Sequence, residues 1–470
     1  MDSKEKCLFI NDTTPDGGLF TGQKKATPPK CNTSWRISPK PFWISQDMFL
    51  YLESLGNHLL AFYQACNLLY FQSVRGIQPP WVSDYLDKGK PKFVIDYGRT
   101  KGFKSHLPMV IRPDILMTGS GPIASELDSV PGGIGFTANM CHQYTQLGYD
   151  IIGKENGIVE NFASMIRSLS KMDEPTLCIV ISEESKDYRN EMMWLGKMLN
   201  QHGLVTYVVK PQEIIWTEEG LLVQINGVNK PIDVLYRFFE LFDLENVPNS
   251  ELMIASVQKK TVIITPPLKS FLEEKMLFAF FHHPVLKPFW RQTLEKETHD
   301  VLTNLFPKTW ILDSQPIPAH AVIPDLIINN HQVNNWDALI TISRKERQFA
   351  IKPSGFSELA WGSKGIFIGH DLSHQAWKKA INKALTDFPT NPYILQEFKK
   401  GSQFTIEYYD FYNHSIQQMN ARVRLCPYYF GINGKAKLSG ILATLCSLDK
   451  KLIHGMVDAV IMPCAVLEKR

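Results

Sequence analysis

Three carboxylates lie close together in the chain. Asp114 precedes the turn 119–121 (Gly-Ser-Gly), and Glu126 and Asp128 follow it. Apolar residues alternate before the turn, which predicts a β-hairpin with Asp114 on one strand and the other two acids on the returning strand. Residues two apart on a strand face the same side. Mg²⁺ binds through a few carboxylates, and substrate phosphates complete its octahedron. The pattern therefore indicates a magnesium site, and the alternative is an ordinary hairpin with solvated acids.

An arginine accompanies these acids. Arg112 lies two residues before Asp114, so on an extended strand both side chains should face the same space. The planar fork of arginine binds a phosphoryl or carboxylate group in bidentate fashion. We therefore predict that Arg112 acts in the chemical step more than in nucleotide binding.

A second candidate site follows a strand predicted at 348–353. Lys352 lies near the end of this strand, and Ser354 and Gly355 begin the loop that follows. Two strands joined by a loop containing glycine and serine can fold over a triphosphate, because backbone N–H groups donate to phosphate oxygens. Lys352 would add a compact positive charge. The strand predicted at 393–398 contains Gln396 and Glu397, which can read an adenine edge or a ribose hydroxyl.

The remaining sequence indicates how these groups are positioned. A helix is predicted from 45 to 73, and strands are predicted at 92–96 and 109–111. Segments 176–182, 187–201 and 204–209 predict a strand, a helix and a strand, which form a βαβ unit. Residues 182–187 contain no glycine, so this unit lacks the dinucleotide fingerprint and a nicotinamide dehydrogenase is disfavoured. Further helices are predicted at 269–281 and 291–305, and Arg422 and Arg424 share one face of a strand at 421–425.

Composition narrows the class of protein. The chain has 470 residues, 44% of them hydrophobic, which is ordinary for a globular protein with two or three domains. Its net charge of +3 gives no argument for nucleic acid or a membrane surface. Eight scattered cysteines without a C-x-x-C pair suggest reduced thiols, and no run reaches the roughly 18 apolar residues that span a bilayer. We therefore expect a soluble cytoplasmic protein.

The order of these motifs resembles a known family. An Arg-x-Asp motif, an acid pair, two well-separated lysines and a Gln-Glu strand are similar to the ATP-grasp carboxylate–amine ligases, specifically their glutathionylspermidine synthase-like branch. In this branch the metal-binding hairpin precedes the lysines, as it does here. The resemblance covers roughly residues 105 to 445. It implies an α/β (α+β) protein with an ATP-grasp-like fold of inverted motif order and an α/β layer like the pre-ATP-grasp domain.

The resemblance also assigns roles to single residues. Arg112 matches the arginine that steadies the transferred phosphoryl group, and Asp114, Glu126 and Asp128 match the Mg²⁺ ligands, with Asp128 replacing the usual Asn. The matches to the ATP-binding groups are Lys296, Lys352, Gln396 and Glu397. Taken alone, Lys296 is equally consistent with a solvated helix lysine. The family's arginine near the carboxyl end is missing after Gly440, and Arg422 or Arg424 could replace it.

Four regions follow from this reading. They are an irregular arm at 1–45, a helical segment with the metal-binding hairpin at 46–150, the α/β layer at 151–267 and the nucleotide-binding domain at 268–470. The implied activity is an ATP- and Mg²⁺-dependent ligase that joins a small carboxylate to an amine through an acyl phosphate. The alternatives are a phosphotransferase on the same fold and a nucleotide-binding protein without catalysis. The substrates and the oligomeric state stay open.

Overall fold

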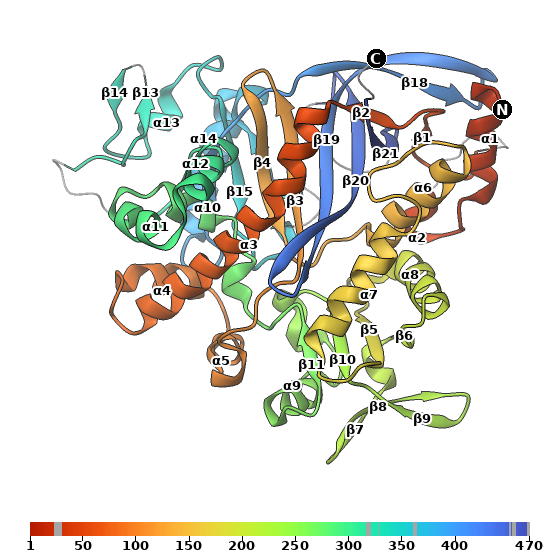
Figure 1. Cartoon of the computed structure of the whole chain (residues 1–470). Coiled ribbons are helices and arrows are strands. Elements are labelled where there is room, and N and C mark those ends of the chain that lie inside the picture. The colour runs from red at the N-terminus through yellow and green to blue at the C-terminus, as the bar shows by residue number, and fades with distance from the viewer. Residues whose placement is uncertain are drawn as a thin grey trace.

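The computed structural model describes residues 1–22, 31–315, 321–328, 330–360, 364–450, 453 and 457–467. Helices and strands alternate along much of the chain, so the protein is of the mixed α/β kind (Figure 1). The longer helices are α1 (Ser3–Thr13), α3 (Gln46–Val74), α4 (Pro80–Asp87), α5 (Lys92–Arg99), α6 (Ile134–Gln146), α7 (Gly157–Leu169), α8 (Arg189–Gln201), α9 (Ser250–Lys259), α12 (Lys296–Leu305) and α14 (His374–Asp387). The short ones are α2 (Gly18–Thr21), α10 (Met276–His282), α11 (Lys287–Thr293) and α13 (Ala338–Thr341).

The largest sheet has eight strands and forms the body of the molecule. Its path is β1-β21-β20-β19-β3-β4, with β18 also paired to β19 and β2 to β21. These strands are β1 (Arg36–Ile37), β2 (Phe42–Ile44), β3 (Val110–Thr118), β4 (Gly121–Asp128), β18 (Gln403–Asp410), β19 (Ser415–Ile432), β20 (Lys435–Ser447) and β21 (Val460–Val466). The predicted hairpin is thus confirmed as β3 and β4, at the end of this path.

The long helix α3 covers one face of this sheet (Figure 1). It begins after Ser45, whose side chain accepts from the backbone N–H of Met48, as an N-cap residue does. Gly56 lets the helix approach closely, because a Cβ there would lie 2.5 Å from the ring of Tyr429 on β19. The predicted helix at 45–73 is confirmed, and it supports the strands that carry the candidate site.

A parallel layer lies on another side of the molecule, at the bottom of Figure 1. Its strand order is β11-β10-β5-β6, with β5 (Leu177–Ile181), β6 (Thr206–Val209), β10 (Val234–Phe238) and β11 (Ile263–Thr265). Every residue of β5 and β10 is buried, as expected for strands covered on both faces. The predicted βαβ unit is confirmed as β5, α8 and β6. A small antiparallel sheet of β7 (Ile214–Thr217), β8 (Gly220–Ile225) and β9 (Val228–Pro231) is attached to this layer.

A third sheet positions the candidate nucleotide-binding groups. It is antiparallel, in the order β12-β17-β15-β16, with β12 (Thr309–Ile311), β15 (Phe349–Pro353), β16 (Phe367–Ile368) and β17 (Tyr393–Glu397). In the register of β15 with β17, Lys352 pairs with Ile394 and Ala350 with Gln396. A separate apolar cluster supports this sheet and includes Trp377 of α14. The short strands β13 (Ile327–Ile328) and β14 (His331–Gln332) form a separate two-stranded sheet within the described residues.

Four local predictions were wrong. The segment 1–45 is not wholly irregular, because residues 3–13 form α1, which buries Cys7 and Ile10. The strand expected at 92–96 is helix α5, whose buried positions Val94 and Gly98 are four residues apart, as on one helix face. The helix expected at 269–281 is interrupted before α10, and the one expected at 291–305 is divided between α11 and α12.

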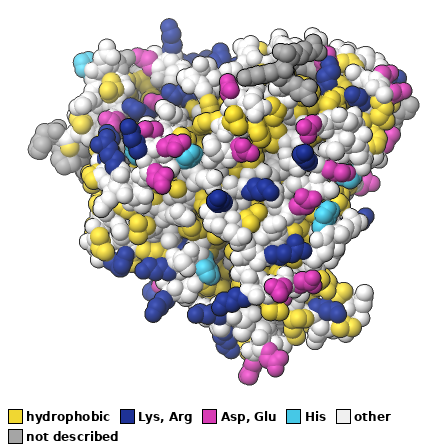
Figure 2. All heavy atoms as spheres, in the orientation of Figure 1, with side chains coloured by type: hydrophobic (Ala, Val, Ile, Leu, Met, Phe, Trp, Pro, Cys, Tyr) yellow, Lys and Arg dark blue, Asp and Glu magenta, His cyan; other side chains and the backbone are white. Residues whose placement is uncertain are grey.

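The surface charges and the cysteines fit the small net charge and the reduced thiols that the sequence predicted. Basic and acidic side chains are interspersed over the face seen in Figure 2, with no large area of a single sign. The eight cysteines all lie in the described residues and form no disulfide. Within the same residues, no helix combines the length and apolarity that crossing a membrane requires.

Candidate functional site

The β3–β4 hairpin brings the predicted charged residues to one place. In its register, Arg112 pairs with Asp128 and Asp114 pairs with Glu126. A β-bulge between Asp114 and Ile115 locally shifts the pairing just beyond these residues. The spacing of two residues on each strand therefore places all four charged side chains together, as the sequence predicted.

Asp114 lies at the centre of an ionic network. Its carboxylate accepts from Arg424 Nη1 at 2.9 Å and lies 3.3 Å from Arg112 Nε. The Cys426 thiol donates to the same carboxylate at 3.4 Å. Burial alone would raise the pKa of Asp114, but Arg424 and Arg112 lower it below its ordinary value. Asp114 therefore stays ionised and orients two guanidinium groups.

Arg112 is held from two more directions. Its Nη2 lies 3.1 Å from Asp128 Oδ2, and its Nη1 donates to the carbonyl oxygen of Gly132 at 3.2 Å. The Arg112 side chain is only 14% exposed, so the surrounding groups fix its direction. Burial raises the pKa of Asp128, although Arg112 opposes this change. The guanidinium plane is thus set before any ligand binds.

The acids differ in how well they suit a metal ion. No three His, Cys, Asp or Glu side chains in the described residues converge as a ready-made metal site. The Asp114 carboxylate already binds two arginines and a thiol, so it fits a positioning role and not the ligand role predicted for it. Glu126 has Lys275 Nζ at 3.4 Å and is 28% exposed, and Asp128 is 33% exposed. Both side chains are partly exposed, so they can add a cation more readily than Asp114, and phosphates would supply the other Mg²⁺ ligands.

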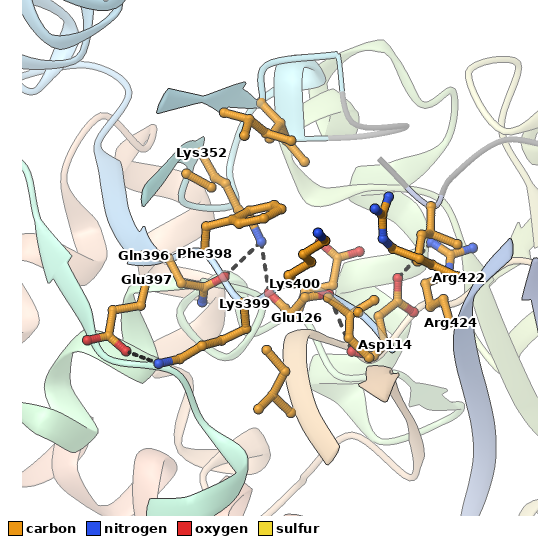
Figure 3. Close-up of a pocket in the computed structure, with 18 of the residues that line it drawn as sticks. Asp114, Glu126, Lys352, Gln396, Glu397, Phe398, Lys399, Lys400, Arg422 and Arg424 are labelled. Carbon is orange, nitrogen blue, oxygen red and sulfur yellow. Dashed lines mark hydrogen bonds and ion pairs between the residues drawn. The ribbon is translucent and has the colours of Figure 1, made fainter. Parts of the chain in front are cut away.

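Lys352, which the sequence predicted as a phosphate-binding lysine, lies on β15 and is buried. Its Nζ donates to Gln396 Oε1 at 2.8 Å and to the carbonyl oxygen of Ser125 at 3.1 Å, which joins the third sheet to the hairpin (Figure 3). Both partners are neutral. Burial lowers the pKa of Lys352 to about 8. A buried lysine without a bound carboxylate offers its charge to an incoming anion.

A cavity of about 410 Å³ opens beside Lys352 (Figure 3). One part of its wall is apolar and includes Leu116, Ile123, Ala350 and Ile368. The other part is polar, and its charged or amide side chains are Asp114, Glu126, Gln348, Lys352, Gln396, Glu397, Lys399, Lys400, Arg422 and Arg424. Small-molecule sites have this size and this mixture of apolar walls with a few convergent polar groups.

A second cavity of about 380 Å³ adjoins the first. Asp114 and Glu126 of the hairpin, Lys352 of β15 and Arg424 of β19 line both cavities, so the two spaces share these charged side chains. The second space is also lined by Arg112, Asp128, Ser129, Gly132, Tyr188, Phe238, Glu240, Glu273, Lys275, Phe356 and Tyr428. Two molecules could therefore approach the same charged groups from opposite sides.

The structure separates the other predicted nucleotide-binding residues into two groups. Gln396 and Glu397 line the first cavity, where Gln396 contacts Lys352 and Glu397 pairs with Lys399 at 2.8 Å. Lys296 is exposed at the start of α12 and lines neither cavity, so it corresponds to the solvated helix lysine.

Ser354 and Gly355 also lie away from the first cavity. The buried Ser354 hydroxyl accepts from the backbone N–H of Met276, so it ties the loop to the start of α10 instead of facing a phosphate. Gly355 lines the second cavity and packs closely, because a Cβ there would lie 2.4 Å from the Glu273 carbonyl oxygen. The rest of this loop is described as far as Ala360, and residues 361–363 lie outside the described residues.

Sequence reasoning missed several charged residues that line the cavities, among them Lys275, Lys399 and Lys400, and it left Arg424 undecided. Lys275 contacts Glu126 and lines the second cavity, but it lies in a segment that was interpreted as the middle of a helix. Its actual place is just before α10, where its backbone N–H donates to the carbonyl oxygen of Ser354. Arg424 was one of two alternatives for the missing arginine, and its contact with Asp114 distinguishes it from Arg422, which donates to the Leu448 carbonyl oxygen.

Comparison with known proteins identifies a related fold. No family model and no curated protein matches the chain. Among solved structures, a glutathione synthetase-like effector from Globodera pallida matches with a TM-score of 0.57 and 12% identity, covering 99% of this chain and 98% of that chain. A provisionally assigned gamma-glutamylcysteine synthetase from Methylobacillus flagellatus KT matches with a TM-score of 0.41 and 14% identity, covering 82% and 87%. The first likeness shows the fold alone, which is glutathione synthetase-like, and the second is too low to carry an argument.

Proposed function

We propose that the protein is an ATP- and Mg²⁺-dependent ligase of the ATP-grasp type that joins a carboxylate to an amine through an acyl phosphate. The observation that carries this proposal is the pair of cavities that meet at Asp114, Glu126, Lys352 and Arg424. Phosphoryl transfer needs a donor and an acceptor in line across one set of charges, and catalysis comes mainly from positioning and electrostatic stabilisation. The glutathione synthetase-like fold is consistent with this chemistry.

The first cavity suits the nucleotide. Its apolar wall can hold a base, and the β17 residues Gln396 and Glu397 can hydrogen-bond to the base edge or to the ribose. Lys352 lies between this wall and the hairpin, and Lys400 and Arg422 add positive charge. The triphosphate would therefore extend from β17 toward the hairpin, and its γ-phosphate would face the second cavity.

The second cavity suits the substrate to be activated. A substrate carboxylate oxygen attacks the γ-phosphorus, the new O–P bond forms, and the bond from that phosphorus to the bridging oxygen breaks to release ADP. The amine then attacks the acyl carbon, phosphate leaves, and the amine nitrogen loses a proton. Arg112 and Arg424 stabilise the negative charge on the transferring group, and Lys275 and Lys352, which also line this cavity, assist them.

The proposed metal site is smaller than the one that the sequence predicted, because it leaves out Asp114. Glu126 and Asp128 would hold Mg²⁺, and Asp114 would orient the two arginines beside it. A metal ion held there would supply positive charge that neutralises the phosphates. Gly355 and Phe356 line the second cavity, so the described part of their loop helps to exclude water from the acyl phosphate.

The direct test is an ADP-release screen with the full-length protein. Amino acids, short peptides and polyamines serve as the library, offered singly and in pairs with ATP and Mg²⁺. The ligase is supported if ADP is released only when a carboxylate and an amine are both present. Nucleotide binding without any turnover across the library would favour a protein that lacks catalysis.

Replacing Lys352 with alanine is expected to weaken the binding of a non-hydrolysable ATP analogue by about 10- to 100-fold. A hydrogen bond to a charged group contributes roughly 1.5–3 kcal/mol, and each 1.4 kcal/mol changes the affinity tenfold. Lys364, which is exposed beyond the same loop, provides the matched control, and Lys364→Ala should change the affinity much less. Calorimetric titration measures both variants, and equal losses would mean that Lys352 is the wrong lysine.

The affinity for the ATP analogue should also depend on pH, because Lys352 titrates. The pKa of Lys352 is lowered to about 8 by burial, so its amine is charged below pH 8 and neutral above it. The ATP analogue should therefore bind more weakly as the pH rises through about 8. Lys352→Arg keeps its charge throughout this range and should remove the dependence. A pH series of titrations that shows the same decline in both proteins would contradict this assignment.

A further inference from the structure

A buried carboxylate outside both cavities contacts the loop that holds Arg112. Glu191 lies on α8 and is 0% exposed. Its Oε1 accepts from the backbone N–H of Gly133 at 2.6 Å, and its Oε2 accepts from that of Phe136 at 2.9 Å. These donors belong to the start of α6, where no side chain of the helix itself supplies a cap. The ligase mechanism above makes no use of this group.

The contacts of Glu191 lead directly to the catalytic arginine. Gly133 follows Gly132, whose carbonyl oxygen accepts from Arg112 Nη1 at 3.2 Å and from the Tyr428 hydroxyl at 2.8 Å. The peptide between these glycines therefore has Glu191 on its N–H side and Arg112 on its carbonyl side. A shift of this peptide would move the acceptor that fixes the guanidinium.

The glycine run is packed tightly between α8 and β19. A Cβ at Gly132 would lie 2.1 Å from the ring of Tyr188, and one at Gly135 would lie 2.1 Å from the Glu191 carbonyl oxygen. Gly133 has a φ of +90°, and a Cβ there would lie 2.6 Å from the Tyr428 hydroxyl. The loop can occupy this space only with glycine at these positions, and it has little room to adopt another conformation.

We propose that Glu191 is a positioning residue for the chemical step, because it fixes the Gly132–Gly133 peptide and thereby the direction of Arg112. A carboxylate can accept from both N–H groups at once, whereas an amide offers one acceptor and turns its NH₂ group toward the second donor. The predicted effect of Glu191 on turnover rests on the proposed ligase function. The structural part of the proposal concerns the arginine alone.

The same arrangement makes the positioning sensitive to pH. Burial raises the pKa of Glu191 to about 7, although its backbone donors oppose the change. The groups that face it are Arg112 on β3, Tyr188 at the start of its own helix, Tyr236 on β10 and Tyr428 on β19. Burial raises the pKa of all three tyrosines, so none of them titrates near pH 7. Below about pH 7 Glu191 becomes protonated and one of its two acceptor oxygens becomes a donor.

The first test follows Arg112 without any substrate. In protein labelled at arginine nitrogen, the Nε–H resonance of Arg112 is assigned by its absence in Arg112→Lys. This resonance should shift in Glu191→Gln, and its titration near pH 7 in the unmodified protein should be lost in that variant. Leu199→Ala provides the control, because it opens a cavity under the same helix away from the loop and should leave the resonance in place. An unchanged resonance in Glu191→Gln, or an equal shift in Leu199→Ala, overturns the proposal.

The second test measures the consequence for catalysis once a substrate pair is known. Glu191→Gln should lower kcat by about 10- to 100-fold, the size of effect seen when residues that orient a functional group are replaced. The KM for ATP should stay nearly constant. Combined with Arg112→Lys, the effects on kcat should be far from additive, because both changes disturb one guanidinium. Additive effects, or an unchanged kcat, overturn the positioning role, whereas lack of turnover in the unmodified protein refutes only the ligase and leaves the arginine test decisive.

Discussion

Replacing Glu126 with glutamine is expected to abolish turnover while leaving the fold intact. Glutamine keeps the shape of the side chain but removes the charge that would hold Mg²⁺ against the phosphates. A metal ion stabilises the developing charge by several kcal/mol, so the loss in kcat should be on the order of 10³-fold. The fold should survive because Glu126 is 28% exposed and its ion pair with Lys275 is partly solvated.

Glu407 provides a matched control for this variant. It also lies on a strand of the large sheet and pairs with a lysine, Lys40, at 2.9 Å, but it lines neither cavity near the hairpin. Glu407→Gln should therefore leave ADP release unchanged. Steady-state ADP release and thermal melting measure both variants. Full activity in Glu126→Gln would remove this residue from the metal site.

Replacing Arg112 with alanine is expected to lower kcat by at least about 10²-fold and to change ATP-analogue affinity little. An interaction made mainly in the transition state affects kcat when it is lost, and removing one charge-stabilising donor typically costs about 10²- to 10³-fold. The structure supports this separation, because Arg112 lines the second cavity and not the first. Arg112→Lys keeps the charge but not the planar fork, so it should recover only part of the rate.

The alanine variant also leaves the two acids that contact Arg112 with fewer partners. Asp114 keeps Arg424, but Asp128 loses the arginine that lies 3.1 Å from it. We therefore expect a lower melting temperature for Arg112→Ala than for Arg112→Lys, and kinetics should be measured well below both. Arg36→Ala is the control, since Arg36 lies in the same large sheet and pairs only loosely with Asp458, at 4.0 Å. A large loss of nucleotide affinity with kcat preserved would place Arg112 in the nucleotide pocket.

The parts of the site that the sequence predicted depend on local geometry. The hairpin follows from alternation and a glycine turn, and these fix the register that pairs Arg112 with Asp128 and Asp114 with Glu126. Lys352 was predicted because a strand fixes the direction of its side chain, and the β15–β17 pairing then brings Gln396 to it. In both cases, neighbours in sequence or on adjacent strands determine the contact.

The parts that sequence reasoning missed depend on contacts between distant segments. Arg424 reaches Asp114 across 310 residues of chain, and no local pattern distinguishes it from Arg422. Lys275 was missed because the apolar residues on both sides of it recur at helical spacing, although the chain leaves the helical conformation before α10. Lys296 has the residue type of an ATP-binding lysine, but α12 turns it to solvent. The Ser354 hydroxyl meets the backbone N–H of Met276, and this contact exists only in the folded chain.

The measurement that tests the ligase most directly is trapping of the acyl phosphate with hydroxylamine. The full-length protein is incubated with ATP, Mg²⁺, hydroxylamine and each carboxylate of the library, and hydroxamate is measured together with ADP. We predict that a carboxylate substrate gives hydroxamate and ADP in equal amounts, and that Glu126→Gln gives neither. ADP release with a stable phosphate ester and no hydroxamate would contradict the acyl-phosphate mechanism and would indicate a phosphotransferase instead.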